Sequence, residues 1–256
     1  MAAKYKLVIV RHGESEFTLK SLFCGFGNDA DLSETGAKEA IHSAELIKAE
    51  GIEFDVAYTS VLKRAIKTLY LIQEELDCHW LPVIKSWRLN ERHHGALQGL
   101  SKSEMAEKYG EDKVKMWRRS YHVRPDPLEK TNERYCFNAK PYAGMDQSMI
   151  PDCESLKDTV ERLLPFWYDE IAPAIKCGKR VLIVAHGNSC RSLVKFLENV
   201  SDDDVINVEV PQGIPLVYEL GEDLRPVKHY YLGSEAELAA GKAKQINQGK
   251  PNFKGY

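Results

Sequence analysis

Short apolar runs alternate along the chain with longer segments whose apolar residues recur at helical spacing. The runs are too short for buried helices and are rich in β-branched residues, which is typical of buried strands. The strands predicted in this way are residues 6–10, 54–58, 80–83, 181–185, 217–220 and 227–232, the last two at the edge of a sheet.

Helices are predicted between these strands from the apolar spacing and from capping residues. Ser33 can cap a helix that ends at Gly51, and Ser60 precedes a second helix. Further helices are predicted at residues 101–119 (in two pieces that Gly110 separates), 154–176 and 188–199.

Strands that alternate with helices predict the α/β class, with a mostly parallel central sheet and helices on both faces. We expect one domain over residues 1–233, with an inserted loop at about 121–151 where the periodicity vanishes and prolines gather. Residues 234–256 carry no apolar face at their end and predict a mobile C-terminal tail. Ligands of such folds bind beyond the carboxyl ends of the strands, so we look for functional residues there.

Composition narrows the possible partners. The 256 residues carry 35 Lys and Arg against 38 Asp and Glu, a net charge of −3, which does not predict nucleic-acid binding. No apolar run approaches the ~18 residues of a membrane span, and the first ten residues lack the pattern of a signal peptide. Six scattered cysteines without a C-x-x-C pair predict reduced thiols and no metal site. We therefore expect a cytoplasmic protein that binds neither membrane nor metal.

Two strands end in closely similar segments. The first reads Lys6-Leu-Val-Ile-Val-Arg-His12-Gly-Glu-Ser15 and the second Arg180-Val-Leu-Ile-Val-Ala-His186-Gly-Asn-Ser189. Both histidines follow a buried parallel strand, at the edge of the sheet where a ligand is expected. The second segment also opens a helix, whose N-terminus favours an anion.

Cations gather around these histidines in the sequence. Taken singly, each is most simply a solvated surface charge, but several stand beside tryptophans that fix the backbone and leave the guanidinium groups available for planar anions. The cations concerned are Arg11, Arg64, Arg88, Arg92, Lys102, Arg118 and Arg119. In a chain of net negative charge, this pattern predicts a pocket for a phosphate-sized anion.

Such a pocket suits phosphoryl transfer through histidine. A neutral imidazole can attack phosphorus, and cations spread the charge over the transferring oxygens. A carboxyl group must also move a proton to or from the substrate oxygen. Glu14 and Glu91 are the candidates among the cations. Motifs of competing chemistry, such as a P-loop, a complete dinucleotide fingerprint, a nucleophile elbow or H-E-x-x-H, are not present.

At these residues the chain resembles the histidine phosphatase superfamily, and more specifically its cofactor-dependent phosphoglycerate mutases over about residues 4–233. The resemblance begins at Arg11-His12-Gly13-Glu14. It continues through Asp29-Ala-Asp-Leu-Ser33, Tyr58-Thr-Ser-Val-Leu-Lys-Arg-Ala65, Trp87-Arg-Leu-Asn-Glu-Arg-His93, Trp117-Arg-Arg-Ser-Tyr121, Cys153-Glu-Ser-Leu-Lys-Asp158 and Ala185-His-Gly-Asn-Ser189.

The resemblance implies a role for each matched residue. His12 would be the phosphorylated nucleophile and Glu91 the proton donor and acceptor, while His186, Arg11 and Arg64 would stabilise the transferring group. The substrate's carboxylate and phosphate would be held by Arg92, Lys102, Arg118 and Arg119, in a pocket lined by Ser15, Thr18, Cys24, Gly25, Gly187 and Asn188. Thr18, Leu22 and residues 137–143 depart from the family pattern.

The activity implied is the interconversion of 3-phosphoglycerate and 2-phosphoglycerate in glycolysis and gluconeogenesis, primed by 2,3-bisphosphoglycerate, in a homodimer or homotetramer. Two alternatives stay open: a bisphosphoglycerate synthase or phosphatase on the same residues, and a catalytically silent anion-binding protein. Ser15, directly after Arg-His-Gly-Glu, is typical of the mutases rather than the synthases. We also expect the tail to fold over the occupied site and exclude water, because residues 235–256 carry four lysines against two glutamates.

Overall fold

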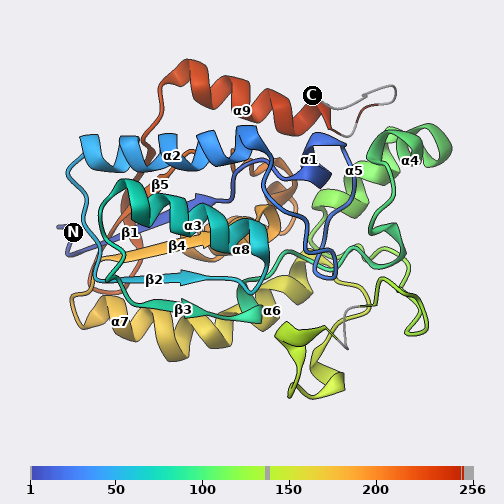
Figure 1. The fold of residues 1–256 in the computed structure, drawn as a ribbon, viewed down its shortest axis with the longest axis horizontal. Coiled ribbons are helices and arrows are strands. Elements are labelled where there is room, and N and C mark those ends of the chain that lie inside the picture. The colour runs from blue at the N-terminus through green and yellow to red at the C-terminus, as the bar shows by residue number, and fades with distance from the viewer. Residues whose placement is uncertain (1, 136–138, 249, 251–256) are drawn as a thin grey trace.

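The computed structural model describes residues 2–135, 139–248 and 250. Its centre is one six-stranded sheet with the strand order β3-β2-β4-β1-β5-β6 (Figure 1). The strands are β1 (Tyr5–Arg11), β2 (Val56–Thr59), β3 (Val83–Lys85), β4 (Val181–Ala185), β5 (Leu216–Leu220) and β6 (Pro226–Tyr231).

The sheet is mixed but mostly parallel, which confirms the predicted fold class. Strand β1 pairs in parallel with β4, which pairs in parallel with β2. Strands β5 and β6 are antiparallel. One expectation was wrong: β5 pairs with both β1 and β6 and is therefore an inner strand, since β6 alone covers its outer side.

The third strand also begins later than the pattern predicts. Residues 80–83 were expected to form it, but β3 begins at Val83, because Pro82 has no N–H to donate to the ladder and only its carbonyl accepts from Ala57. Trp80, which gave the segment its apolar character, is 71% exposed.

Helices cover both faces of the sheet. On one face α2 (Glu34–Ala49) and α3 (Lys63–Glu75) pack their apolar sides against the strands. On the other lie α6 (Leu156–Phe166), a π-helical turn (Trp167–Ile171), α7 (Ala172–Lys176) and α8 (Gly187–Glu198). The predicted helix at 154–176 is thus present, with a π turn directly after Pro165.

A smaller group of helices and turns lies beyond the carboxyl ends of the strands. Helices α4 (Lys102–Tyr109) and α5 (Glu111–Arg119) meet at Gly110, whose φ of +87° favours glycine, as the split predicted. They pack with Phe23 and Leu97 into a small apolar cluster. The other short elements are α1 (Glu16–Leu19) and the 3₁₀ turns at Trp87–Leu89, Gly95–Leu97, Lys140–Tyr142, Gln147–Met149 and Asp204–Asn207.

The inserted loop is irregular but packed against the domain. Tyr142 and Ile150 are buried beside Phe26, and the Tyr142 hydroxyl donates to the Phe26 carbonyl at 3.2 Å. Residues 137 and 138 of the segment that departs from the family pattern, and Cys136 among the cysteines, lie outside the described residues. The five described cysteines are free.

The C-terminal segment contains a helix that the apolar pattern did not predict. Residues Glu235–Asn247 form α9, which Ser234 and Glu237 begin with a capping box. The helix lies along the outer side of α2, where His42 bonds to Glu237 at 2.8 Å (Figure 1). Of the tail predicted to be mobile, residues 234–256, the part Glu235–Asn247 forms this helix, and residues 249 and 251–256 lie outside the described residues. Among the described residues no helix is long and apolar enough to cross a membrane.

Candidate active site

The two matched histidines meet at the carboxyl ends of adjacent strands. Because Arg11 of β1 lies opposite Ala185 of β4, the next residues, His12 and His186, lie side by side. Their ring centroids are 4.9 Å apart in an edge-to-face arrangement, and both side chains are buried. A cavity opens in front of His12. The pairing that the repeated segment predicted is therefore present.

The turn after β1 requires a glycine. A Cβ atom on Gly13 would lie 2.1 Å from the Gly36 carbonyl oxygen, so only glycine lets the first turn of α2 approach this closely. The approach also places Thr68 of α3 within 3.1 Å of the Gly13 N–H. Packing from two helices thus fixes the backbone on which His12 stands.

Hydrogen bonds define which nitrogen of His12 faces the cavity. Its Nδ1 lies 2.6 Å from the Gly13 carbonyl oxygen, which can only accept, so Nδ1 carries the proton. The Arg64 Nε–H points at His12 Nε2 at 3.3 Å, which marks Nε2 as the nitrogen with the free electron pair. His12 is thereby prepared as a nucleophile through Nε2.

Burial also keeps His12 neutral. Desolvation, together with the charges of Arg64 and Arg11, lowers the pKa of His12 well below its usual value. Desolvation and Arg64 lower the pKa of His186 in the same way. The His186 Nε2 lies 2.8 Å from the Ser60 hydroxyl, while its Nδ1 is buried without a hydrogen-bond partner among the described residues.

Arg64 and Arg11 flank the nucleophile from two sides. Arg64 is held by the carbonyl oxygens of Gly25 and Asn28, at 3.2 and 3.0 Å, which aims its Nε at His12. Arg11 donates Nη1 to the Val210 carbonyl at 3.0 Å, and its buried Nε has no partner within the described part of the chain. Both guanidinium groups line the cavity and are placed to neutralise an anion beside His12.

Of the two candidate carboxylates, only Glu91 reaches the cavity. Its Oε1 accepts from the backbone N–H of Arg92 and from the backbone and side-chain amides of Asn188, at 2.8, 3.1 and 2.9 Å. In the described structure Oε2 accepts no hydrogen bond, so it is the oxygen available to a ligand. Burial acts to raise the pKa of Glu91, but these hydrogen bonds and the nearby arginines outweigh it and lower the pKa.

Glu14 does not share this position. Its carboxylate accepts from the Ser33 hydroxyl at 2.9 Å and pairs with Lys244 of α9 at 2.7 Å, and it does not line the cavity. Of the two carboxylates that the sequence places among the cations, only Glu91 is therefore near the cavity, because Ser33 and Lys244 hold Glu14 beside α2 and α9.

The helix N-terminus predicted to favour an anion already binds one. The first N–H groups of α8 include that of Asn188, which donates to Glu91. Asn188 cannot be oriented the other way, because its Oδ1 accepts from the Arg191 guanidinium at 2.7 Å. The anion at this helix end is thus the Glu91 carboxylate.

Further cations line the same cavity or lie next to residues that line it. Burial and Arg118 lower the pKa of Lys102 well below its usual value, and burial and Arg119 lower that of Arg118 to about 9. Arg92, with a pKa lowered by burial to about 10, has Nε and Nη1 buried without partners among the described residues. Desolvation and mutual repulsion disfavour the charged forms of these side chains. An anionic ligand would relieve the repulsion, so the cluster favours binding of an anion.

Most of the predicted residues line this cavity. Ser15, Arg92 and His186 lie directly behind its wall, and the Ser15 hydroxyl bonds to that of Thr18 at 2.9 Å. Arg119 pairs with Glu209 at the cavity's edge. The predicted residues that line it are Arg11, His12, Thr18, Cys24, Gly25, Arg64, Glu91, Lys102, Arg118, Arg119, Gly187 and Asn188.

Four polar residues of the cavity were not predicted from the sequence. His94 and Arg191 could have been found, because one follows the cation-rich segment directly and the other stands one helical turn after Asn188. Gln245 and Gln248 of the α9 segment gave no signal, since neutral amides near a chain end are common. No cluster of three or more His, Cys, Asp or Glu side chains able to hold a metal ion occurs among the residues described.

The fold, with two histidines beside a cation-lined cavity, agrees with a family of enzymes that the sequence matches. Residues 7–136 match the model of the histidine phosphatase superfamily (branch 1). The chain therefore belongs to the histidine phosphatase superfamily.

Solved structures show the same fold. A mycobacterial glucosyl-3-phosphoglycerate phosphatase, solved with VO3, is 21% identical, with a TM-score of 0.66 over 89% of this chain and 96% of that chain. A putative alpha-ribazole-5′-P phosphatase of Escherichia coli is 19% identical, with a TM-score of 0.63 over 89% of this chain and 94% of its own. The alpha-ribazole phosphatase of Shigella flexneri is also 19% identical, with a TM-score of 0.63 over 87% and 94%.

Proposed function

We propose that the protein is a phosphoglycerate mutase that interconverts 3-phosphoglycerate and 2-phosphoglycerate through phosphorylated His12. The observation that carries the proposal is one cavity that is lined both by His12 and by cations from several elements. Arg11 and Arg64 lie beside His12, and Lys102 and Arg118 line the same cavity. A small ligand with two anionic groups matches this number of cations, and phosphoglycerates are such ligands.

Five residues in and beside the cavity take roles in this reaction. His12 Nε2 attacks phosphorus, while Arg11 and Arg64 neutralise the charge that builds on the transferring oxygens. His186 supports the transfer from behind His12. Glu91, through its free Oε2, gives a proton to the leaving oxygen of the substrate and takes one from the attacking oxygen in the reverse step.

The priming donor of such an enzyme, 2,3-bisphosphoglycerate, fits the unsatisfied donors of the site. The buried Nε of Arg11, a residue that lines the cavity, has no partner among the described residues, and a phosphate oxygen would supply one. Lys102 and Arg118 would hold its second phosphate. Bound there, it supplies the phosphoryl group that first loads His12.

A mutase protects its phosphohistidine from water, whereas a phosphatase hydrolyses it. The α9 segment lies where it can provide this protection. Gln245 and Gln248 line the cavity, and the Lys102 ammonium donates to Gln248 Oε1 at 3.2 Å. A cavity closed in this way protects the phosphohistidine from water. The solved structures compared above are named as phosphatases, so hydrolysis on the same residues is the competing function.

A product assay separates these functions. The purified protein is given 3-phosphoglycerate with a trace of 2,3-bisphosphoglycerate, and the formation of 2-phosphoglycerate and the release of phosphate are followed together by phosphorus NMR. We expect isomerisation to exceed phosphate release at least tenfold, to need the trace donor when the protein starts dephosphorylated, and to be unchanged by EDTA.

Other outcomes would assign a different function. Phosphate release that outruns isomerisation would identify a phosphatase, and net accumulation of 2,3-bisphosphoglycerate a synthase. Binding of the substrate without any turnover would identify a silent anion-binding protein. The His12→Asn variant is the control, because it keeps the shape of the cavity and loses the nucleophilic nitrogen.

A further inference from the structure

The segment that carries Glu91 has little regular structure of its own. Residues 87–93 form one 3₁₀ turn and then an irregular stretch between β3 and the turn at Gly95. Such a stretch does not satisfy its own carbonyl groups by a helix or a strand ladder. The position of Glu91 must therefore be set by side chains from elsewhere in the fold.

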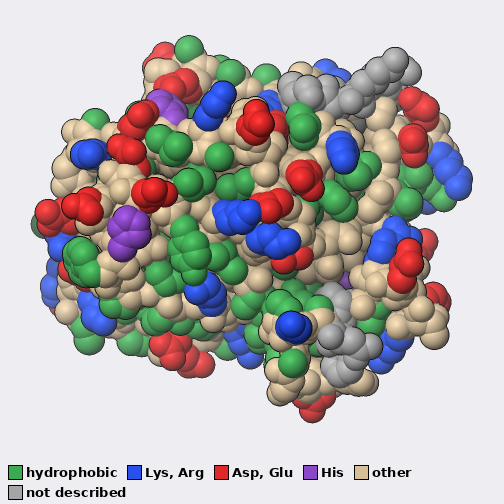
Figure 2. Space-filling view, viewed as in Figure 1, with side chains coloured by type: hydrophobic (Ala, Val, Ile, Leu, Met, Phe, Trp, Pro, Cys, Tyr) green, Lys and Arg blue, Asp and Glu red, His purple; other side chains and the backbone are tan. Residues whose placement is uncertain are grey.

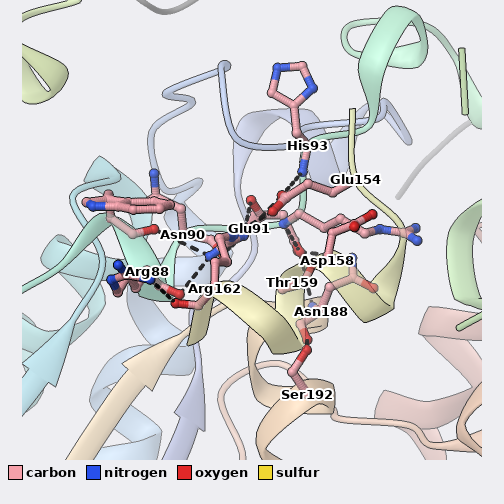
Figure 3. Close-up of polar contacts among 12 residues, drawn as sticks. Arg88, Asn90, Glu91, His93, Glu154, Asp158, Thr159, Arg162, Asn188 and Ser192 are labelled. Carbon is pink, nitrogen blue, oxygen red and sulfur yellow. Dashed lines mark hydrogen bonds and ion pairs between the residues drawn. The ribbon is translucent and has the colours of Figure 1, made fainter. Parts of the chain in front are cut away.

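Arg162 of α6 supplies most of these contacts (Figure 3). Its Nη1 donates to the Arg88 carbonyl at 2.6 Å, and its Nη2 donates to the carbonyls of Asn90 and Glu91 at 3.0 and 3.3 Å. The side chain is buried, with 8% of its surface exposed. One planar guanidinium group thus holds the backbone on both sides of the Glu91 Cα atom.

Glu154 completes the arrangement on the other side of Glu91. Its carboxylate pairs with Arg162, with Nε to Oε1 at 2.6 Å, and its Oε2 accepts the His93 N–H at 2.7 Å. The Glu154 N–H in turn donates to the His93 carbonyl at 2.8 Å. Arg162 and Glu154, which we call the Arg162–Glu154 clamp, therefore fix the segment from Arg88 to His93.

The clamp does not touch the cavity. Neither Arg162 nor Glu154 lines the cavity. Both side chains instead bond to each other and to the backbone of the Glu91 segment. The carboxylate of Glu91 itself is fixed separately by Asn188, whose amide Arg191 orients. Backbone and carboxylate are thus held by different elements, α6 and α8, and the free Oε2 has one defined position.

We propose that Arg162 and Glu154 are positioning residues for proton transfer by Glu91. The proposal rests on the phosphoryl-transfer function proposed above. A general acid must lie within hydrogen-bond reach of the oxygen that it protonates, so a shift of the 88–93 backbone moves Oε2 away from the leaving group. The clamp acts through Glu91 on the protonation of the leaving oxygen, and it lines neither the cavity nor the contacts of His12.

A double-mutant cycle tests this. The rate of His12 phosphorylation by 2,3-bisphosphoglycerate is measured in single turnover for the wild type, Arg162→Met, Glu91→Gln and the double variant. We expect Arg162→Met to lower the rate roughly 100-fold with KM changed by less than about threefold. In the Glu91→Gln background, Arg162→Met should lower the rate by less than about threefold, because the carboxyl group that Arg162 positions is already absent. Arg162→Lys keeps the positive charge but lacks the planar set of guanidinium donors, and it should recover part of the rate that Arg162→Met loses.

Matched controls separate positioning from folding. Arg124→Met removes an exposed arginine that pairs with Asp158 of α6 and contacts no residue of the Glu91 segment, so it should leave the rate unchanged. If Arg162→Met fails to fold, as judged by circular dichroism, Glu154→Gln serves instead. It keeps an oxygen for its partners and should lower the rate about tenfold, again only when Glu91 is present.

The outcomes of the cycle are distinct. Equal losses in both backgrounds would overturn the clamp and assign a structural role to the pair, while the proposed function would stand. If Glu91→Gln alone leaves the rate unchanged, or if the wild type takes up no acid-labile phosphate, the proposed function itself fails.

Discussion

Two contacts decide the chemistry of His12. The Gly13 carbonyl fixes the proton on Nδ1, and Arg64 stands at Nε2 with a positive charge that disfavours protonation there. Neither contact depends on a bound ligand. The nucleophile is therefore prepared before substrate arrives, which lowers the cost of organising the site during the reaction.

The assignment of the nucleophile predicts a covalent label. Brief incubation with 2,3-bisphosphoglycerate should attach one phosphate per chain that is labile to acid and stable to base, as expected for phosphohistidine. His12→Asn should abolish the label, because it removes the attacking nitrogen. His186→Asn should slow its formation roughly 10- to 100-fold, since the support behind His12 is lost. A label that persists in the His12 variant would contradict the assignment.

The lowered pKa of His12 predicts an unusual titration. Burial and the charges of Arg64 and Arg11 disfavour the imidazolium, so the ring should stay neutral as the pH falls from about 8 to about 6, where an ordinary histidine takes up a proton. Proton NMR of the imidazole resonances measures this directly. Arg64→Met should raise the pKa of His12, because one of the two nearby cations is removed.

His42 provides the internal control in the same spectra. Burial acts to lower its pKa, but hydrogen bonds to Glu45 and Glu237 outweigh it and raise the pKa. His42 should therefore take up its proton at a higher pH than an ordinary histidine, opposite in direction to His12. Titration of both rings at the same ordinary pH would show that burial does not control the nucleophile.

At the scale of elements, α9 connects the chain end to the cavity. Arg118 donates to the Gln245 carbonyl at 3.3 Å, and the Ser21 hydroxyl donates to the Gln248 carbonyl at 3.1 Å. Lys244, directly before Gln245, pairs with Glu14 and with Glu39 of α2. The helix is thus bound both to the body of the domain and to residues that line the site.

This arrangement predicts the effect of removing the helix. Deletion of residues 237–256 should lower mutase turnover roughly tenfold or more and raise the ratio of phosphate release to isomerisation, because water then reaches the phosphohistidine. Lys244→Ala should shift the ratio in the same direction by a smaller factor. Phosphorus NMR of the product mixture measures both activities at once.

The same helix offers a matched control. Lys242 is exposed and stands two residues before Lys244, so Lys242→Ala removes the same charge without removing a contact to the domain. It should leave the ratio unchanged. Equal effects of the two lysine variants would show that the charge of the segment, rather than its docking, controls hydrolysis.

At the scale of the whole molecule, the surface and the cavity differ in the charges that they carry. On the face shown in Figure 2, basic and acidic side chains are interspersed, in keeping with the net charge of −3. The cations that line the cavity are instead buried or partly buried together, and desolvation lowers the pKa values of Arg118 and Lys102. Attraction of anions is therefore a property of the cavity rather than of the surface.

One edge of the sheet offers a surface through which copies of the chain could associate. Strand β3 is an edge strand, and beside it Trp80 and Tyr70 are 71% and 48% exposed. Unpaired edges and exposed aromatic side chains favour association between copies of a chain.

We therefore predict a homodimer or homotetramer. Light scattering at micromolar concentration should give a multiple of 29.1 kDa. Trp80→Ser should weaken association at least about tenfold, or about 1.4 kcal/mol. A monomeric mass at all concentrations would contradict this prediction.

The sequence by itself determined the parallel strands β1, β2 and β4 at the centre of the sheet and the two histidines that follow β1 and β4. Apolar runs that end in His-Gly need no tertiary information, because a buried strand and the glycine after it are recorded locally, and parallel strands bring their carboxyl ends to one edge. The split at Gly110 followed for the same reason, since a positive φ is a local requirement.

Only the tertiary structure decided which side chains complete the site. Glu14 and Glu91 looked alike in the sequence, but contacts with Ser33 and Lys244 turn Glu14 away, while Asn188 fixes Glu91 in the cavity. The Arg162–Glu154 clamp and the two glutamines of the α9 segment belong to parts of the chain far from the histidines. Their roles depend on which surfaces pack together, and that information is distributed over the whole chain rather than written in any one segment.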